Sequence, residues 1–241
     1  RSIALHHVYR ALQQASNFKR FEMEHGRKAE RRSAYFFILA YAFLSIGRFT
    51  RRHCSSLMKQ DMMINTRKET IVALEAIDTR LRWLSSWTVH HATHIRPKRD
   101  ELKVGGHQAS CASMTAIMTA LYFHALRPQD KVAVKPHAGP VLQAIHYLLG
   151  QQTLDQLQRF RGLGGAQSYP SRTKDQIPVD FSTGSVGLGV AITAFSSLVQ
   201  DYLIAHGQMD EANAGRMISL MGDAELDEGN IYECLIEGYK H

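Results

Sequence analysis

Apolar residues recur at helical spacing along the middle of the chain. Between Thr66 and Ile95 they stand at every third or fourth position, which predicts a long helix that is closed by Pro97. A second helix is predicted over residues 110–126, where the many Ala, Ser and Thr side chains indicate close packing against a neighbouring helix or sheet. Further segments of this kind predict helices over residues 140–149, over residues 190–206 and from residue 230 onward.

Two short apolar runs predict buried strands instead. They span Asp130–Val134 and Arg216–Met221, and turn residues follow each of them. Helices separate the two runs, and this alternation is typical of an α/β fold with a doubly wound, mostly parallel sheet and helices on both faces. Ligands bind such sheets at the carboxyl ends of the strands. We therefore expect the functional residues directly after the strands.

Charge and glycine divide the chain into two parts. Residues 1–62 hold 12 of the 29 Lys and Arg but only 4 of the 22 Asp and Glu. All but two of the 17 glycines lie from Gly105 onward. We expect residues 1–62 to be a basic extension, helical or poorly ordered and of unknown role, and residues 63–241 to be a separate domain. The net charge of +7 belongs to the extension, so nucleic-acid binding is a weak alternative that concerns that segment alone.

Composition excludes several protein classes. A hydrophobic share of 44% with 21% charged residues does not fit a disordered tail, and no run of apolar residues is long enough for a multi-span membrane protein. The three cysteines form no C-x-x-C pair, which indicates neither a disulfide framework nor a structural zinc site. We expect a cytoplasmic protein that binds neither membrane nor nucleic acid.

Candidate chemistry lies at the predicted strand ends and in a glycine-rich loop. Asp223 follows a strand and a glycine, where a carboxylate can bind Mg²⁺, although an aspartate that caps the next helix is the commoner case. His107 and His137 stand at junctions before helices, where an imidazole can transfer protons. Residues 162–189 form a loop of a length that is usually functional or disordered, and it leads into a helix whose N–H groups could attract phosphate.

Five motifs occur in an order that resembles a known family. The sequence resembles the N-terminal cofactor domain of thiamine-diphosphate enzymes of the transketolase superfamily over roughly residues 70–241. It is most similar to the homodimeric decarboxylating component of the pyruvate dehydrogenase complex, and next to transketolase. The motifs are Gly105-Gly106-His107-Gln108-Ala109-Ser110, Lys135-Pro136-His137, Ser168-Tyr169-Pro170, Ser185-Val186-Gly187-Leu188-Gly189 and Gly222-Asp223-Ala224-Glu225-Leu226-Asp227-Glu228.

The resemblance implies thiamine diphosphate and Mg²⁺ as cofactors and assigns a role to each motif. Asp223 would bind the Mg²⁺ that holds the cofactor diphosphate, and His107 and His137 would line the active-site funnel. The remaining implied cofactor-binding residues are Ser110 and Tyr169 near the diphosphate or substrate, Gly222 and Ala224 at the diphosphate, Val186 and Gly187 at the aminopyrimidine, and Glu228 in an acidic network between the sites of a dimer.

Three departures from the family pattern affect these expectations. Ala224 stands where the pattern has a third glycine, and Lys135 stands where the pyruvate dehydrogenase pattern has a neutral amide. A further Mg²⁺ ligand, an asparagine, belongs farther beyond the aspartate than the 18 residues that follow Asp223 here. We therefore expect an incomplete portion of the enzyme, or one of two subunits, that is inactive by itself.

The function expected from the resemblance is decarboxylation of a 2-oxo acid such as pyruvate. Transketolase-like ketol transfer, with a sugar phosphate as substrate, is one alternative. The other is a non-catalytic fragment or interaction module that retains the fold. The expected partners are a second copy of the chain and the acyltransferase core of a multienzyme complex.

Overall fold

The computed structural model describes residues 56–98, 100 and 102–240, and the expected extension lies outside the described residues up to residue 55. The helices and strands predicted from the sequence are all found, with ends shifted by a few residues, except that the first helix begins at Ser56 and not near Thr66. In chain order the elements are α3 (Ser56–His90), the π-helical turn η1 (His91–Ile95), α4 (Gln108–Ala120), the π-helical turn η2 (Leu121–Ala125), β1 (Lys131–Ala133), the 3-10 turn η3 (Pro136–Ala138), α5 (Gly139–Leu148), α6 (Leu154–Gln158), α7 (Leu188–Ala205), the 3-10 turn η4 (Glu211–Asn213), β2 (Met217–Ser219), the 3-10 turn η5 (Ala224–Asp227) and α8 (Gly229–Lys240).

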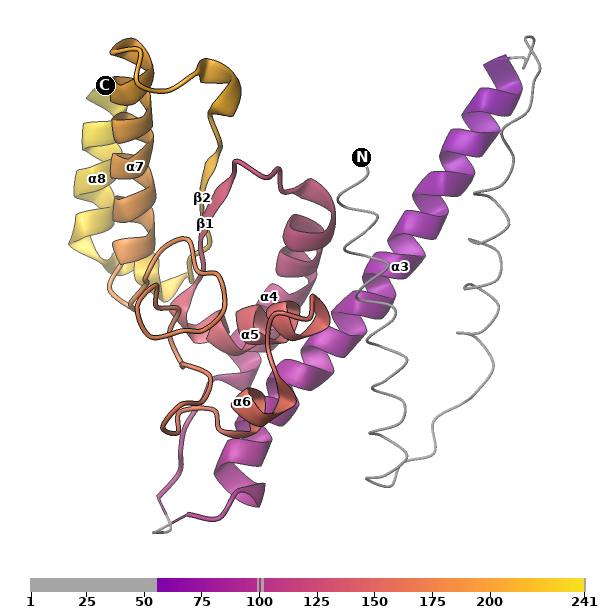
Figure 1. Cartoon of the computed structure of the whole chain (residues 1–241), viewed down its shortest axis with the longest axis vertical. Helices are drawn as coiled ribbons and strands as arrows, with labels where there is room; N and C mark the ends of the chain where they lie inside the picture. Colours follow the sequence, from indigo (N-terminus) through magenta and orange to yellow (C-terminus); the bar gives the residue numbers. More distant parts are fainter. Residues whose placement is uncertain (1–55, 99, 101, 241) are drawn as a thin grey trace.

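Strands β1 and β2 pair in parallel, with Val132 opposite Ile218, and form the sheet of the described residues. Helices α3, α4 and α5 lie on one side of this pair and α7 and α8 on the other (Figure 1). The predicted parallel sheet with helices on both faces is therefore confirmed for one pair of strands. A larger doubly wound sheet stays a prediction.

The two faces of the strand pair differ in the size of their side chains. Ala133 and Ser219 point toward Gly189 in the first turn of α7, where an added methyl group would lie 3.5 Å from the Ala133 Cβ and 3.4 Å from the Ser219 Oγ. Small residues on both sides let the α7 backbone approach the sheet closely. The side chains packed in the main core with α3, α4 and α5 are large and apolar, namely Val132, Val134, Ile218 and Leu220.

Helix α4 buries one stripe and exposes another. Cys111, Met114 and Met118 pack into the core beside α3 and α5. The alanines at 112, 116 and 120 are exposed, so the expected close packing of the small residues holds only for the buried stripe. The reason is the helical period, which places these alanines on the face opposite the core.

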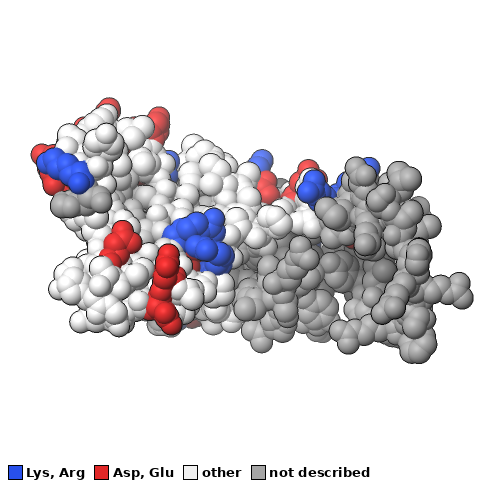
Figure 2. Space-filling view, turned by 90° about the horizontal axis from the view of Figure 1, so that it is seen from above, with Lys and Arg blue, Asp and Glu red and all other residues white. Residues whose placement is uncertain are grey.

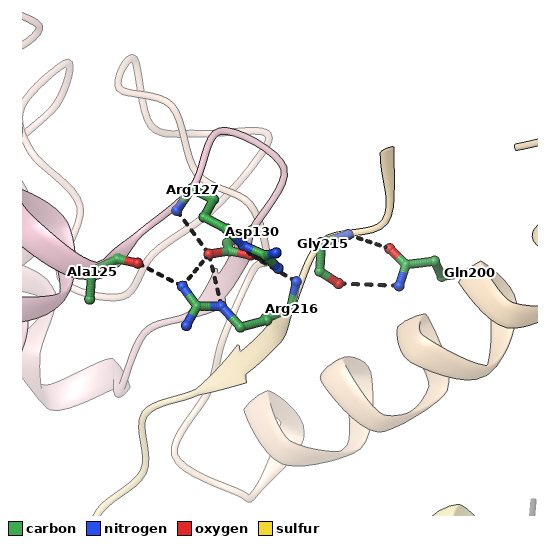
Figure 3. Close-up of polar contacts among 6 residues, drawn as sticks. All are labelled: Ala125, Arg127, Asp130, Gln200, Gly215 and Arg216. Carbon is green, nitrogen blue, oxygen red and sulfur yellow. Dashed lines mark hydrogen bonds and ion pairs between the residues drawn. The ribbon is translucent and has the colours of Figure 1, made fainter. Parts of the chain in front are cut away.

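One buried carboxylate joins the starts of the two strands (Figure 3). Asp130 has a fully buried side chain and accepts hydrogen bonds from the guanidinium groups of Arg127 at 2.9 Å and Arg216 at 2.5 Å. It also accepts the backbone N–H groups of Arg127 at 2.9 Å and Arg216 at 2.8 Å. Gln200 of α7 bonds both backbone polar groups of Gly215, at 3.0 and 3.1 Å, and so holds the residue before Arg216. The register of the sheet is thus fixed from its amino end.

Helices α7 and α8 share an apolar face that the rest of the described chain does not cover. By length and composition α7 could cross a membrane, and only 17% of it is buried. Its glycine end nevertheless packs on the sheet. On the face drawn in Figure 2, acidic and basic side chains of the described residues form small separate groups. The exposed large apolar side chains of the two helices are Leu188, Ile192, Phe195, Val199, Tyr202, Tyr232, Leu235, Ile236 and Tyr239.

Replacing Asp130 by Ala is expected to lower the free energy of unfolding by about 2–3 kcal/mol at pH 7. This is somewhat below the usual loss for a broken buried ion pair, because water can reach the two arginine side chains. The Arg216 guanidinium, helped by Arg127, holds the pKa of Asp130 far below its usual range. The stabilisation is therefore complete above pH ~4 and is lost progressively as the pH falls below that value.

Urea denaturation at pH 7 and pH 3 measures both effects, with Asp155→Ala as the matched control. Asp155 forms an exposed ion pair with Arg159 on α6, and its loss should cost about 0.5 kcal/mol or less. Equal losses in the two variants would contradict the role given to Asp130.

Candidate functional site

The parallel pairing brings two of the predicted motifs to the same edge of the sheet. Lys135-Pro136-His137 follows β1, and Gly222-Asp223 follows β2. The two segments are in contact, since a methyl group added to Gly222 would lie 3.0 Å from the Lys135 Nζ. This edge is where an open parallel sheet binds ligands.

Three residues predicted from different motifs meet beside this edge. The rings of His107 and His137 have centroids 4.1 Å apart, and the His137 Nε2 lies 3.2 Å from the Tyr169 hydroxyl. Together they line a small hollow. Its other lining residues are Gly106, Pro136, Pro140, Phe160, Arg161 and Ser168.

The two glycines before His107 are required by close packing. Gly106 has a φ of +139°, and a methyl group there would lie 2.6 Å from a Val89 Cγ. Gly105 has a φ of +86° and lies against the guanidinium of Arg161, which donates to the Val104 carbonyl at 2.8 Å. A side chain at Gly106 would push this segment off α3, and the positive φ at both positions strains any residue other than glycine. The glycines therefore bring His107 close to His137.

His137 is a neutral imidazole near pH 7. Burial lowers its pKa, and the neighbouring side chains of His107, Lys135 and Arg161 act in the same direction, while the Glu225 carboxylate opposes them. Its backbone carbonyl accepts the Cys111 thiol at 3.4 Å. Burial raises the pKa of that thiol to about 12, so Cys111 is no nucleophile. The ring of His137 is therefore one group in the hollow that can exchange a proton.

Glu225 is buried, whereas the neighbouring acidic residue Asp227 is exposed. Its Oε2 accepts the Gly222 N–H at 2.8 Å, which turns the side chain inward beneath the strand end. A buried carboxylate that bonds backbone N–H fixes the shape of the turn.

Lys135 places a cation between the two motifs. Its side chain is partly buried and lies against the Gly222 backbone. Within the part of the chain that the structure describes, no carboxylate lies within ion-pair distance of it. Its charge lowers the pKa values of both His137 and Cys111. The strand ends therefore hold a cation that is available to an anionic ligand.

The other predicted residues lie around this centre without joining it. Asp223 and Ala224 are exposed in the turn after β2. Ser110 lies in the first turn of α4, where its carbonyl accepts the Ser113 hydroxyl at 3.0 Å. Glu228 ends η5, and its N–H donates to the Glu225 carbonyl at 3.1 Å. Among residues 56–98, 100 and 102–240, no three His, Cys, Asp or Glu side chains gather in a metal-binding group.

Val186 and Gly187 form a separate junction at the start of α7. The Val186 carbonyl accepts the Asn230 amide of α8 at 2.8 Å. Gly187 has a φ of +73°, and a methyl group on it would lie 2.6 Å from the Asn230 Oδ1. That oxygen is buried and has no hydrogen-bond partner in the described chain. The two residues thus lie beside a buried acceptor, on the α7 side of the strands.

Sequence reasoning missed Arg161 because its place depends on loop geometry. Among the residues that the structure describes, Arg161 is the one non-glycine residue with a positive φ, 60°. Its guanidinium lies 5.5 Å from the centre of the Phe160 ring. No periodicity or motif marks such a residue. The position of Glu225 does have one recognisable feature in the sequence. It stands three residues after Gly222, where a side chain can accept the N–H of a turn.

Comparison with known proteins relates part of this chain to one group of enzymes. The chain is 30% identical over 159 residues to the pyruvate dehydrogenase E1 component of Mycolicibacterium smegmatis, which covers 61% of this chain and 16% of that protein. It is 29% identical over 161 residues to the Escherichia coli K12 protein of the same name, with 63% and 18% covered. It is 30% identical over 141 residues to mouse transketolase-like protein 2, with 54% and 21% covered.

No family model matches the chain, and it spans about a fifth or less of the length of these curated relatives. Relatives with both names nonetheless align with more than half of it. Over that part of its length, the chain is related to the thiamine-diphosphate enzymes of the transketolase superfamily.

Proposed function

We propose that this chain forms the diphosphate-binding portion of a thiamine-diphosphate enzyme that decarboxylates a 2-oxo acid such as pyruvate. The observation that carries the proposal is the convergence of His107, His137 and Tyr169 beside the strand end that holds Lys135 and Gly222. The names of the pyruvate dehydrogenase relatives support the substrate class. Transketolase-like ketol transfer is the second candidate, supported by the transketolase relatives.

The residues present fit such a cofactor in two places. The Lys135 ammonium beside Gly222 suits a diphosphate, because a glycine leaves the backbone open and the cation balances phosphate charge. The buried Asn230 Oδ1 beside Gly187 lacks a donor within the described chain, and an aromatic amine could supply one if the start of α7 moved to admit it. The exposed carboxylate of Asp223 can supply one oxygen ligand to Mg²⁺.

The cofactor would supply the electron sink for cleavage of a carbon–carbon bond. The residues of this chain would bind and orient. His137, neutral at pH 7, can accept a proton at its ring nitrogen, and the Tyr169 hydroxyl fixes the direction of that ring. His107 and Arg161 add hydrogen-bond donors at the rim of the hollow.

We further propose that the protein is a cytoplasmic homodimer and that it associates with the acyltransferase core of a multienzyme complex. The uncovered apolar face of α7 and α8 supports the dimer, since contiguous exposed apolar surface of this kind marks an interface. The association with an acyltransferase rests on the names of the pyruvate dehydrogenase relatives.

Replacing Asp223 by Ala is expected to weaken Mg²⁺-dependent binding of thiamine diphosphate about tenfold or more, because a carboxylate ligand to the metal is removed. Isothermal titration calorimetry on the chain, with and without Mg²⁺, measures this. Asp227→Ala is the matched control, since Asp227 is exposed in the same turn. Equal affinities for wild type and Asp223→Ala would favour the non-catalytic fragment.

Replacing Lys135 by Met is expected to weaken binding of inorganic pyrophosphate about tenfold, because the apolar stem is kept and the charge is removed. The same titration without metal tests the charge alone. Lys68→Met, an exposed position on α3, should leave the affinity unchanged. If both variants lost the same affinity, the effect would be one of net charge and not of the site.

Replacing Val199 by Glu is expected to shift the protein from dimer to monomer, since a charge would be buried without a partner at the interface. Val199 is 57% exposed in the middle of the apolar face. Light scattering after size-exclusion chromatography gives the molar mass. Leu163→Glu, in a loop away from that face and 99% exposed, is the control, and a monomeric wild type would refute the proposed dimer.

A further inference from the structure

Tyr169 reaches His137 from a segment with no helix or strand of its own. Residues 159–187 contain neither, and Tyr169 lies within them. A hydroxyl held 3.2 Å from the His137 ring needs a backbone that is fixed by other contacts, because a free loop would carry the phenol away from the imidazole. The question is which side chain fixes it.

The carboxylate of Asp175 bonds the chain on both sides of Tyr169. Its Oδ2 accepts the Ser171 N–H at 2.8 Å. Its Oδ1 accepts the backbone N–H of Gln167 at 3.4 Å. The two donors stand two residues before and two residues after Tyr169. One carboxylate thus spans the turn that carries the phenol, in the manner of an aspartate that closes a loop on its own backbone.

Helix α5 holds this carboxylate in place. Gln143, buried to 1% exposure, donates from its Nε2 to the Asp175 Oδ1 at 2.8 Å. Its own Oε1 accepts the Gln152 amide at 2.5 Å, which fixes the direction of the Gln143 amide. The same helix carries His137 on the turn just before it. The bonds therefore connect both partners of the Tyr169–His137 contact to one rigid element.

A second contact presses the turn against the start of α5. A methyl group on Gly139 would overlap the Ser168 carbonyl and would lie 3.8 Å from the Pro170 ring. The Pro170 carbonyl accepts the Thr183 N–H at 3.1 Å, and the Thr183 hydroxyl donates to the Val134 carbonyl at 2.8 Å. Asp175 thus acts on a turn that already lies against the strand end.

We propose that Asp175 is a positioning residue. Anchored by Gln143, it holds the backbone on both sides of Tyr169 and so keeps the Tyr169 hydroxyl on the His137 ring. The geometric claim concerns the chain without ligand. Its importance for catalysis rests on the proposed function.

The test uses nuclear magnetic resonance of the ¹⁵N-histidine-labelled chain, without cofactor or metal. Tyr169→Phe defines the change in the His137 Nε2 resonance that follows loss of the hydroxyl. Asp175→Asn is expected to shift that resonance in the same direction by at least half as much, and Tyr169→Phe combined with Asp175→Asn should shift it no further than Tyr169→Phe alone. Ligand binding plays no part, so failure of the proposed function leaves this result intact.

Asp180→Asn is the matched control. Asp180 belongs to the same loop and also holds backbone, since its Oδ2 accepts the Val132 N–H at 3.0 Å, but it bonds neither flank of Tyr169. The Asp180→Asn variant should leave the His137 resonance unshifted even if it lowers the stability of the protein. A shift as large as that in Asp175→Asn would show a general loosening of the loop and overturn the proposal, as would an unshifted resonance in Asp175→Asn.

If Asp175→Asn does not fold, Gln143→Met decides the question. Methionine keeps the volume of Gln143 and removes the amide that donates to Asp175. The His137 resonance should then move in the direction defined by Tyr169→Phe. An unchanged resonance in folded Gln143→Met would show that Tyr169 is held by other contacts.

Discussion

The parallel pairing of β1 and β2 is the constraint on which the candidate site depends. Three residue pairs make up the ladder, too few to fix the register by themselves, so the fully buried carboxylate of Asp130 between Arg127 and Arg216 does so. Because both strands start from this anchor and run the same way, both end at the same edge. Lys135 and His137 leave one strand there and Gly222 leaves the other. A slip by one residue would move Val132 out of the core and Ala133 away from Gly189.

The site itself is assembled from loops that pack on rigid elements. His107 is placed by two glycines that fit against Val89 and Arg161, and Tyr169 by a turn that lies on the start of α5. His137 is the exception, since it follows β1 directly and takes its position from the sheet. This division explains why the properties of the hollow depend on backbone contacts far from its centre.

The elements and three of the site residues could be predicted from the sequence, because periodicity and strand-end placement are local signals. The helix ends agree to within a few residues, except that α3 continues back to Ser56. What could not be predicted depends on which particular groups form hydrogen bonds in the folded chain. The inward turn of Glu225 follows from one bond to the Gly222 N–H, and the place of Arg161 follows from the Val104 carbonyl 57 residues earlier. Neither contact leaves a periodic trace.

The charges at the strand ends bear on how an anion and a metal could be bound together. The Glu225 carboxylate accepts the Gly222 N–H, and the Lys135 ammonium lies against the same glycine. Asp223, the next residue along the chain, presents its carboxylate to solvent. A phosphate drawn to Lys135 would be repelled by Asp223 unless a divalent cation lay between them, because two anions in contact disfavour each other. Under the proposed function, a metal bound by the exposed Asp223 would let a diphosphate lie beside both Lys135 and Asp223.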